Sequence, residues 1–323
     1  MVNSATLSPR MRAAAILGLG CSAKNLKPFQ SDSNIEWHVG LPASVEHADV
    51  VLLFGGDGTI HRHLGQLVRL GLPVLVVPAG SGNDFACSIG LRRLRDSLAA
   101  WGKFCEGAGN VRDVDLGVIA AMEYAGGAPS TTAQGRSAPH IPRYFCCVAG
   151  VGLDGEVSRR ANRLPRWVRR HGGYLLTLAP AIFTFAPLPV KVLAPAETVQ
   201  SSAAGNGENA SWATRSDQLT LLAAFANTPL YGGGMKIAPQ AKMDDGLLDI
   251  CIVGAVAPFR LLRLFPSVYR GRHLKLCEVG YFQASRVRVE TEHPLDVYAD
   301  GEYVCRTPIE VSVQRAALKV ITR

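Results

Sequence analysis

The sequence predicts an α/β N-terminal domain followed by a β-rich sandwich domain. Its 323 residues exceed the size at which one hydrophobic core usually stops growing. The first third alternates apolar strands with an amphipathic helix, whereas later segments are short, rich in β-branched residues and separated by Gly, Pro or Asp. We therefore expect domains at 1–111 and 112–323, and leave open whether the C-terminal segment returns to the first domain.

The N-terminal elements predict a parallel sheet. Residues 60–70 carry apolar side chains at helical spacing and end before Gly71 and Pro73, so they should form a helix. A further strand is expected near Trp37, and the few residues between it and Val50 leave room only for a shortened crossover helix. Three runs are apolar throughout, as expected for strands covered on both faces: 13–19, 50–54 and 73–77.

The C-terminal segments predict an antiparallel β domain. Two polar stretches, 125–140 and 196–217, should form long surface loops between its strands. The expected strands are 112–119, 144–148, 190–193, 219–226, 248–253, 286–291 and 309–313.

Composition narrows the class of protein. Thirty-four Lys plus Arg against 26 Asp plus Glu give a formal charge of +8, which suits an anionic partner without choosing nucleic acid, lipid or phosphate. The eight cysteines include no CxxC pair, which argues against a zinc site or disulfide framework and favours a reducing cytoplasm. Prolines at 180, 187 and 189 interrupt the apolar region 174–194, so we expect no membrane-spanning helix there.

Two glycine-rich loops follow successive strands. Residues 54–59 read FGGDGT at the start of the predicted helix, where glycines let the backbone approach a ligand and free N–H groups suit phosphate. An ordinary tight βα turn, with Asp57 as a turn residue, explains this motif alone equally well. Residues 78–86 read PAGSGNDFA. Because successive parallel strands end at one edge of a sheet, both loops should serve one ligand site.

GGDGT followed by PxGxxNDFA resembles the catalytic domain of diacylglycerol, sphingosine and bacterial soluble lipid kinases. NAD kinases share GGDGT, but the NDFA segment resembles the lipid branch. The resemblance implies a Rossmann-like parallel sheet of the NAD-kinase and diacylglycerol-kinase type, followed by a β sandwich, with the active site in the cleft between the domains. Further matching blocks fall in family order: 149–154 (AGVGLD), 231–239 (YGGGMKIAP), 244–249 (DDGLLD) and 300–302 (DGE).

The resemblance also implies the site residues. Asp245 should bind Mg²⁺ together with the main-chain carbonyls of Lys242 and Leu247, and Asp300 should accept the proton of the lipid hydroxyl. Without the resemblance, both aspartates are ordinary turn residues beside glycine. Asp57 is expected to organise a second, nucleotide-bound Mg²⁺ and to serve the site, not the core. The residues expected at ATP are Gly55, Gly56, Asp57, Gly58, Thr59, Ile60, His61, Arg62, Ser81, Asn83 and Asp84.

Three positions depart from the family pattern. Arg62 replaces a usual acidic residue, with His61 beside it in place of a common Asn, so Mg²⁺ near the phosphates should be less well organised. Arg62 on a solvated helix face is the simpler alternative. Cys147 stands where Asn is frequent.

Basic residues gather in two apolar-rich segments, which suits either a membrane interface or solvated helices. No nucleic-acid module surrounds them, so we expect peripheral membrane contact and no nucleic-acid partner. The segments contain Arg159, Arg160, Arg163, Arg166, Arg169 and Arg170, and Arg260, Arg263, Arg270, Arg272, His273 and Lys275.

These observations predict an ATP- and Mg²⁺-dependent lipid kinase that phosphorylates a hydroxyl, with diacylglycerol as the first choice of acceptor. The alternatives are a kinase of a sphingoid base, another lipid alcohol, a soluble polyol or NAD, and a non-catalytic nucleotide- or lipid-binding homologue. We expect a cytoplasmic protein that associates transiently with the inner membrane surface. The oligomeric state stays open.

Overall fold

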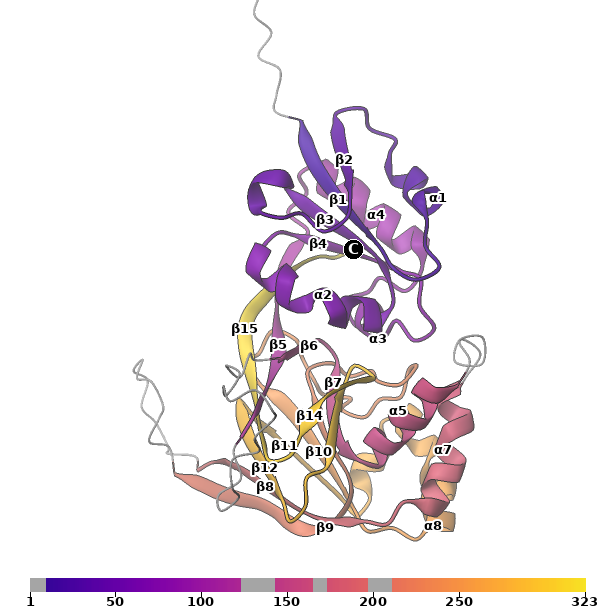
Figure 1. Ribbon diagram of the computed structural model, residues 1–323, viewed down its shortest axis with the longest axis vertical. Coiled ribbons are helices and arrows are strands. Elements are labelled where there is room, and N and C mark those ends of the chain that lie inside the picture. Colours follow the sequence, from indigo (N-terminus) through magenta and orange to yellow (C-terminus); the bar gives the residue numbers. More distant parts are fainter. Residues whose placement is uncertain (1–9, 123–142, 165–172, 197–210) are drawn as a thin grey trace, which may run out of the picture. The chain divides into compact units, whose positions relative to one another are not determined.

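The computed structural model describes residues 10–122, 143–164, 173–196 and 211–323 (Figure 1). They form two compact units. Unit 1 contains the described residues of Met1–Val114 together with Ala316–Arg323, and unit 2 contains those of Asp115–Arg315. The predicted loop 125–140 and the arginines at 166, 169 and 170 lie outside the described residues.

Unit 1 is built on a parallel sheet, as the apolar runs predicted. Its strands are hydrogen-bonded in the order β4, β3, β1, β2. The end of β15 (Ile309–Ile321) adds to this sheet through a parallel pairing of Val320 with Val74. The four strands are β1 (Met11–Leu17), β2 (Ile35–Val39), β3 (Val50–Gly55) and β4 (Val74–Pro78).

The helices of unit 1 cover this sheet. Helix α2 (Asp57–Leu70) buries an apolar stripe against β3 and ends at Gly71, whose φ of 61° suits glycine. Between β2 and β3 there is only the 3₁₀ turn η2 (Val45–His47), so the crossover is shortened as expected. The remaining helices are α1 (Ala23–Leu26), η1 (Lys27–Phe29), α3 (Asp84–Ser88) and α4 (Leu94–Cys105).

Unit 2 is an antiparallel sheet structure. Its main path of paired strands is β14, β13, β7, β9, β8, β12, β15, with β10 and β11 joined through β9. Apolar side chains of alternate positions fill a core that includes Phe145, Phe225 and Ile250. The strands are β5 (Val111–Ala121), β6 (Arg143–Phe145), β7 (Val148–Gly152), β8 (Leu188–Pro195), β9 (Trp212–Ala226), β10 (Leu248–Gly254), β11 (Val279–Ala284), β12 (Arg286–Thr291), β13 (Asp296–Ala299) and β14 (Glu302–Arg306).

Two predictions for unit 2 were wrong. The expected strand 144–148 is two strands separated by a bend at Cys146 and Cys147, because backbone N–H groups there turn toward a carboxylate described below. Most of the expected loop 196–217 lies outside the described residues, but its last part is a strand, since β9 begins at Trp212 and pairs with β8. Its polar sequence was misleading because one face of an antiparallel strand can lie in solvent.

Several helices gather on one side of unit 2 (Figure 1). Helix α5 packs on α7, and α7 packs on α8. A second core, including Leu153, Val157 and Ile182, lies among them. None of the helices in the described parts of the chain is long and apolar enough to cross a membrane. These helices are α5 (Leu153–Arg163), α7 (Gly173–Thr184), α8 (Pro258–Leu264), α9 (Pro266–Tyr269) and η3 (His273–Lys275).

Candidate active site

The two glycine-rich loops of unit 1 pack backbone to backbone. We call residues 55–59 the first loop and residues 78–83 the second loop. A Cβ on Gly56 would lie 2.8 Å from the Cα of Gly80, and a Cβ on Gly80 would lie 2.6 Å from the Cα of Gly56. Real side chains do not tolerate such contacts, so glycine is required at both positions for the loops to approach this closely.

Asp57 joins the first loop to α3. Its Oδ2 accepts the N–H of Asp84 at 3.0 Å, and its Oδ1 accepts the N–H of Phe85 at 3.1 Å. The carboxylate therefore caps the first turn of α3. Asn83, which precedes that helix at φ 57°, bonds the backbone of Gly80 in both directions. Asp57 thus has a structural contact that sequence reasoning missed.

The first loop opens the 14-residue helix α2, whose N-cap is Gly56. The N-terminal N–H groups and the helix dipole favour an anion at this end. The residues expected at ATP differ in whether their side chains are accessible to a nucleotide. Ile60 is buried in the core, so only its backbone is available. Arg62 and Ser81 are exposed, and Asp84 is buried.

The expected magnesium ligands lie on one loop of unit 2. Asp115, a buried residue of β5, holds this loop in place. Its Oδ2 accepts the N–H of Gly246 at 2.7 Å, and its own N–H donates to the carbonyl of Met243 at 2.6 Å. Asp245 Oδ1 accepts the N–H of Leu247 at 3.0 Å. Asp115 was missed by the sequence analysis, although a carboxylate between Val114 and Leu116 is a signal for a buried polar contact.

This loop fits a hard divalent cation. Its donors are the Asp245 carboxylate and the carbonyls of Lys242 and Leu247, which are the oxygen ligands that Mg²⁺ prefers. A second carboxylate, Asp249, is fully buried and accepts hydrogen bonds from Tyr281 and Gln283. Burial raises the pKa of Asp249, and the neighbouring charge of Asp245 raises it further. Two interacting acidic groups create a negative potential that a cation would relieve.

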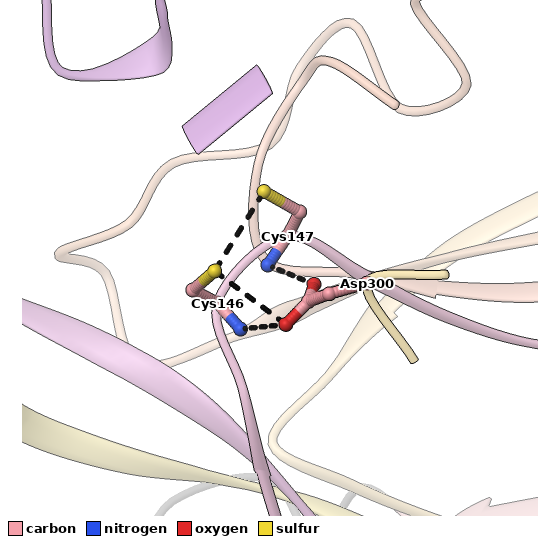
Figure 2. A group of neighbouring side chains, drawn as sticks. All are labelled: Cys146, Cys147 and Asp300. Atoms are coloured by element: carbon pink, nitrogen blue, oxygen red, sulfur yellow. Dashed lines mark hydrogen bonds between the residues drawn. The ribbon is translucent and has the colours of Figure 1, made fainter. Parts of the chain in front are cut away.

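Asp300 lies in the turn between β13 and β14, with φ 51°. Its Oδ2 accepts the N–H of Cys146 at 2.9 Å, and its Oδ1 accepts the N–H of Cys147 at 2.8 Å (Figure 2). Oδ1 also accepts the N–H of Val148 at 3.3 Å. Its own N–H donates to the carbonyl of Val148 at 3.0 Å. Asp300 therefore creates the bend between β6 and β7. The exposed Glu302 begins the next strand.

An apolar pocket opens among the helices of unit 2. Its empty volume is about 880 Å³, including open solvent at its mouth, which falls within the usual range for small-molecule sites. Its polar lining residues include Asp154, His273 and Glu278. The apolar lining comes from α5, α7, α8 and β9, with Leu153, Val157, Leu178, Ile182, Leu221, Leu261, Leu264 and Phe265 among them.

The chain is similar to known proteins along most of its length. The model of the diacylglycerol kinase catalytic domain matches residues 37–119, and the model described as YegS C-terminal NAD kinase beta sandwich-like domain matches residues 147–322. A diacylglycerol kinase of Mycobacterium tuberculosis is 33% identical over 291 residues, covering 90% of this chain and 82% of that protein. The chain belongs to the diacylglycerol kinase family of lipid kinases.

Two further proteins are similar to this chain over most of its length. A diacylglycerol kinase of Bacillus subtilis is 24% identical over 268 residues, which cover 82% of this chain and 75% of that protein. The crystal structure of a diacylglycerol kinase from Bacillus anthracis superposes with a TM-score of 0.62 at 16% identity, covering 97% of each chain. This likeness supports the α/β domain and the β sandwich.

Family membership makes the chain a lipid kinase, and a kinase of this family uses ATP as its phosphoryl donor. The sequence-predicted site residues fall into three described groups. The residues expected at ATP lie in the two packed loops of unit 1 and at the starts of α2 and α3. In unit 2, the residues expected to bind magnesium share the loop fixed by Asp115, and Asp300 lies in the turn that orders Cys146 and Cys147.

Proposed function

We propose that this lipid kinase transfers the γ-phosphoryl group of ATP to the hydroxyl of diacylglycerol. The apolar pocket of unit 2 carries this proposal. Its walls are aliphatic and aromatic side chains, and such walls favour acyl chains over NAD or a soluble polyol because each buried methylene adds about 0.8 kcal/mol to binding.

The first and second loops would hold the phosphates. Gly56 and Gly80 leave the two backbones close together without side chains, and the start of α2 offers N–H groups to phosphate oxygens. Asp57 would stay near a nucleotide-bound Mg²⁺ while capping α3. Phosphoryl transfer needs mainly positioning and charge stabilisation, so a rigid loop pair is suited to it.

Asp245, with the carbonyls of Lys242 and Leu247, would hold a second Mg²⁺. When bound, such an ion neutralises charge on phosphate oxygens. The chain's own contribution is to fix the loop through Asp115, whose hydrogen bonds to Gly246 and Met243 are short and buried.

Asp300 is the proposed proton acceptor, with Glu302 as the alternative. An ionised carboxylate has about four lone-pair sites. Three N–H groups already bond to Asp300, so little acceptor capacity is left for a hydroxyl. This observation is the reason for keeping Glu302 as the alternative. Glu302 is exposed, and a carboxylate within hydrogen-bond reach of the hydroxyl is what the reaction requires.

Membrane contact would come from the α8 surface, which we define as Phe183, Phe259, Arg260, Leu262 and Arg263. Phe259 is 78% exposed, Phe183 is 48% exposed and Leu262 is 44% exposed. The rings of Phe183 and Phe259 touch edge to face. Exposed apolar side chains beside arginines suit a membrane carrying anionic lipid. A cytoplasmic enzyme could thus meet its lipid at the inner membrane surface.

A sphingoid base is a second candidate acceptor. Asp154 lines the pocket, and a carboxylate in an apolar wall can pair with the ammonium group of such a lipid. Diacylglycerol lacks this cation, so only a sphingoid base would pair with the carboxylate of Asp154.

The direct test is transfer of labelled phosphate from ATP to extracted total lipid, followed by identification of the product. Purified diacylglycerol, a sphingoid base, another lipid alcohol and NAD would be assayed in parallel. We expect labelled phosphatidic acid and little product from the other acceptors. A dominant labelled sphingoid base or NADP would contradict the proposed substrate, and ATP binding without any product would indicate a non-catalytic homologue.

Substitutions at Val256 test the pocket. Val256 lines the pocket and is half-buried, so Val256→Trp should narrow it without rebuilding the core, and Val256→Ala is the matched control. We expect Val256→Trp to raise the KM for long-chain diacylglycerol by about tenfold, the cost of a few lost methylene contacts, and to spare a short-chain acceptor. An equal rise in KM for long-chain and short-chain acceptors would show that the pocket does not bind the acyl chain.

A further inference from the structure

Two adjacent cysteines and a carboxylate converge at the bend between β6 and β7 (Figure 2). Among the described residues, Cys146, Cys147 and Asp300 are the one group of three potential metal-binding side chains, with ligand atoms all within 4.8 Å of one another. Both cysteines are buried, and Asp300 is half-buried.

The backbone holds both sulfurs on the same side. In a continuous strand, successive side chains point to opposite faces, and two adjacent thiols could not share a ligand. Here the N–H groups of Cys146 and Cys147 bond to Asp300. The fully buried Asn227 holds their carbonyls, through Nδ2 to Cys146 at 3.1 Å and through its N–H to Cys147 at 2.8 Å. The bend is therefore fixed on both sides.

The distances match a tetrahedral thiolate site. The Sγ atoms of Cys146 and Cys147 are 3.9 Å apart. Two sulfurs bound to one tetrahedral Zn²⁺ at about 2.3 Å lie roughly 3.8 Å apart. The Sγ of Cys146 is 3.5 Å from Oδ2 of Asp300. A sulfur and a carboxylate oxygen on the same ion, at about 2.3 and 2.1 Å, lie roughly 3.6 Å apart.

We propose that Cys146, Cys147 and Asp300 bind a thiophilic divalent cation, with Zn²⁺ as the best match. Each thiol would lose its proton to solvent on binding, and the fourth position would take a water molecule, as in zinc sites with three protein ligands. Sulfur ligands exclude Mg²⁺, so this site is chemically distinct from the oxygen-only loop at Asp245. The absence of a CxxC pair argued against a zinc site, and the cysteine spacing could not reveal the third ligand because Asp300 lies 153 positions from Cys147.

Occupancy would also affect phosphoryl transfer. A cation on Oδ2 of Asp300 would take the oxygen that bonds Cys146 and withdraw the carboxylate from proton transfer. This consequence rests on the proposed role of Asp300, whereas the binding itself does not. Zn²⁺ should then inhibit at a saturating Mg²⁺ concentration.

The test uses the full-length, chelator-treated protein under reducing conditions. Zn²⁺ binding is measured by calorimetry, and Co²⁺ is added separately to report thiolate-to-metal charge transfer and tetrahedral ligand-field bands. The variants are Cys146→Ser, Cys147→Asn and Asp300→Asn. Cys147→Asn installs the amide expected at this position in the family, so it should fold. The control is Cys105→Ser with Cys277→Ser, which removes two exposed thiols elsewhere.

We expect one Zn²⁺ per chain and thiolate bands with Co²⁺ in the wild type and in the control. Loss of any one ligand should weaken binding by more than the roughly 10–100-fold that an outer-shell substitution costs, at an unchanged melting temperature in Cys147→Asn. No binding to the wild type, or equal binding to Cys147→Asn, would overturn the site. Tight Zn²⁺ binding without inhibition of phosphoryl transfer would support the metal site and would overturn the proposed role of Asp300 as proton acceptor.

Discussion

At the scale of single residues, Asp57 connects the first loop to α3. Because its carboxylate accepts two N–H groups, Asp57→Ala should lower the free energy of unfolding by about 1–2 kcal/mol as well as reduce ATP-dependent activity sharply. The sequence suggested an effect on the site alone. Chemical denaturation and ATP calorimetry on the same variant separate the two effects, with Asp113→Ala, which removes an exposed carboxylate outside both loops, as the control. An unchanged unfolding free energy would show that the cap contributes nothing.

Asp300 and Glu302 are distinguished by a pair of amide substitutions. If Asp300 is the proton acceptor, Asp300→Asn should reduce turnover by about 10²–10⁴-fold, with the lower end favoured by a loose transition state. Glu302→Gln should then have a small effect. Lipid phosphorylation and nucleotide calorimetry are measured on variants with unchanged melting temperature. The reverse order of effects would assign the base to Glu302 and leave Asp300 as the residue that shapes the bend.

His273 gives a prediction for pH. Burial lowers its pKa, and the hydrogen bond between Nε2 and the carbonyl of Ile237 opposes this only in part. The unfolded chain therefore takes up the proton first, near the ordinary value of about 6.5, so the contribution to stability is present above that pH and is lost as the pH falls below it. Denaturation between roughly pH 7 and pH 5 should show a steeper loss for the wild type than for His273→Gln, by at most about 1.4 kcal/mol per pH unit. Parallel plots of unfolding free energy against pH for the wild type and His273→Gln would contradict this role of His273.

Single residues also show where sequence reasoning stops. The meeting of the two glycine-rich loops could be predicted, and Gly56 and Gly80 do pack together, whereas the roles expected for the acidic residues of the motifs stay predictions. Asp115 could not, because its partners Gly246 and Met243 are far away in sequence and only the fold brings them together. Asp300 was named from its motif, but its role in the bend could not be predicted, because its bonds to Cys146 and Cys147 cross 154 and 153 positions.

At the scale of elements, the apolar runs predicted three parallel strands well, β1, β3 and β4, because they are largely apolar and buried. β3 begins at Val50 as predicted. The elements that were missed are amphipathic or short. β11 and β14 mix polar and apolar residues because one face is exposed, and the division of 144–148 depends on Asp300 and not on local propensity.

The α8 surface is an element whose role can be tested directly. Phe259→Ala with Leu262→Ala should weaken binding to vesicles containing anionic lipid by about tenfold or more, because each apolar side chain that enters a membrane contributes about 1.5–3 kcal/mol. Val39→Ala with Leu94→Ala removes comparable exposed side chains from unit 1 and serves as the matched control. Vesicle co-sedimentation at fixed salt measures the effect. Equal behaviour of the two double variants would remove the α8 surface from membrane contact.

At the scale of the whole molecule, the formal charge of +8 predicts a salt-dependent attraction to anionic membranes. Binding should weaken as salt rises from low to physiological concentration, because exposed charges are screened over about 8–10 Å. Vesicles of neutral lipid are the control and should show a weak, salt-independent signal. Binding to anionic vesicles that ignores salt would mean that apolar contact alone holds the protein there.

The pairing of Val320 with Val74 has a consequence for biosynthesis. Unit 1 contains residues from both ends of the described chain, so its sheet cannot be completed until residues 316–323 have left the ribosome. Until then β4, whose residues Val74–Val77 are buried in the finished fold, has an open edge that could pair with another chain. The ribosome must therefore synthesise all of unit 2 while the edge of β4 is still unpaired. Translation speed and chaperone access thus become part of how this kinase reaches its native state.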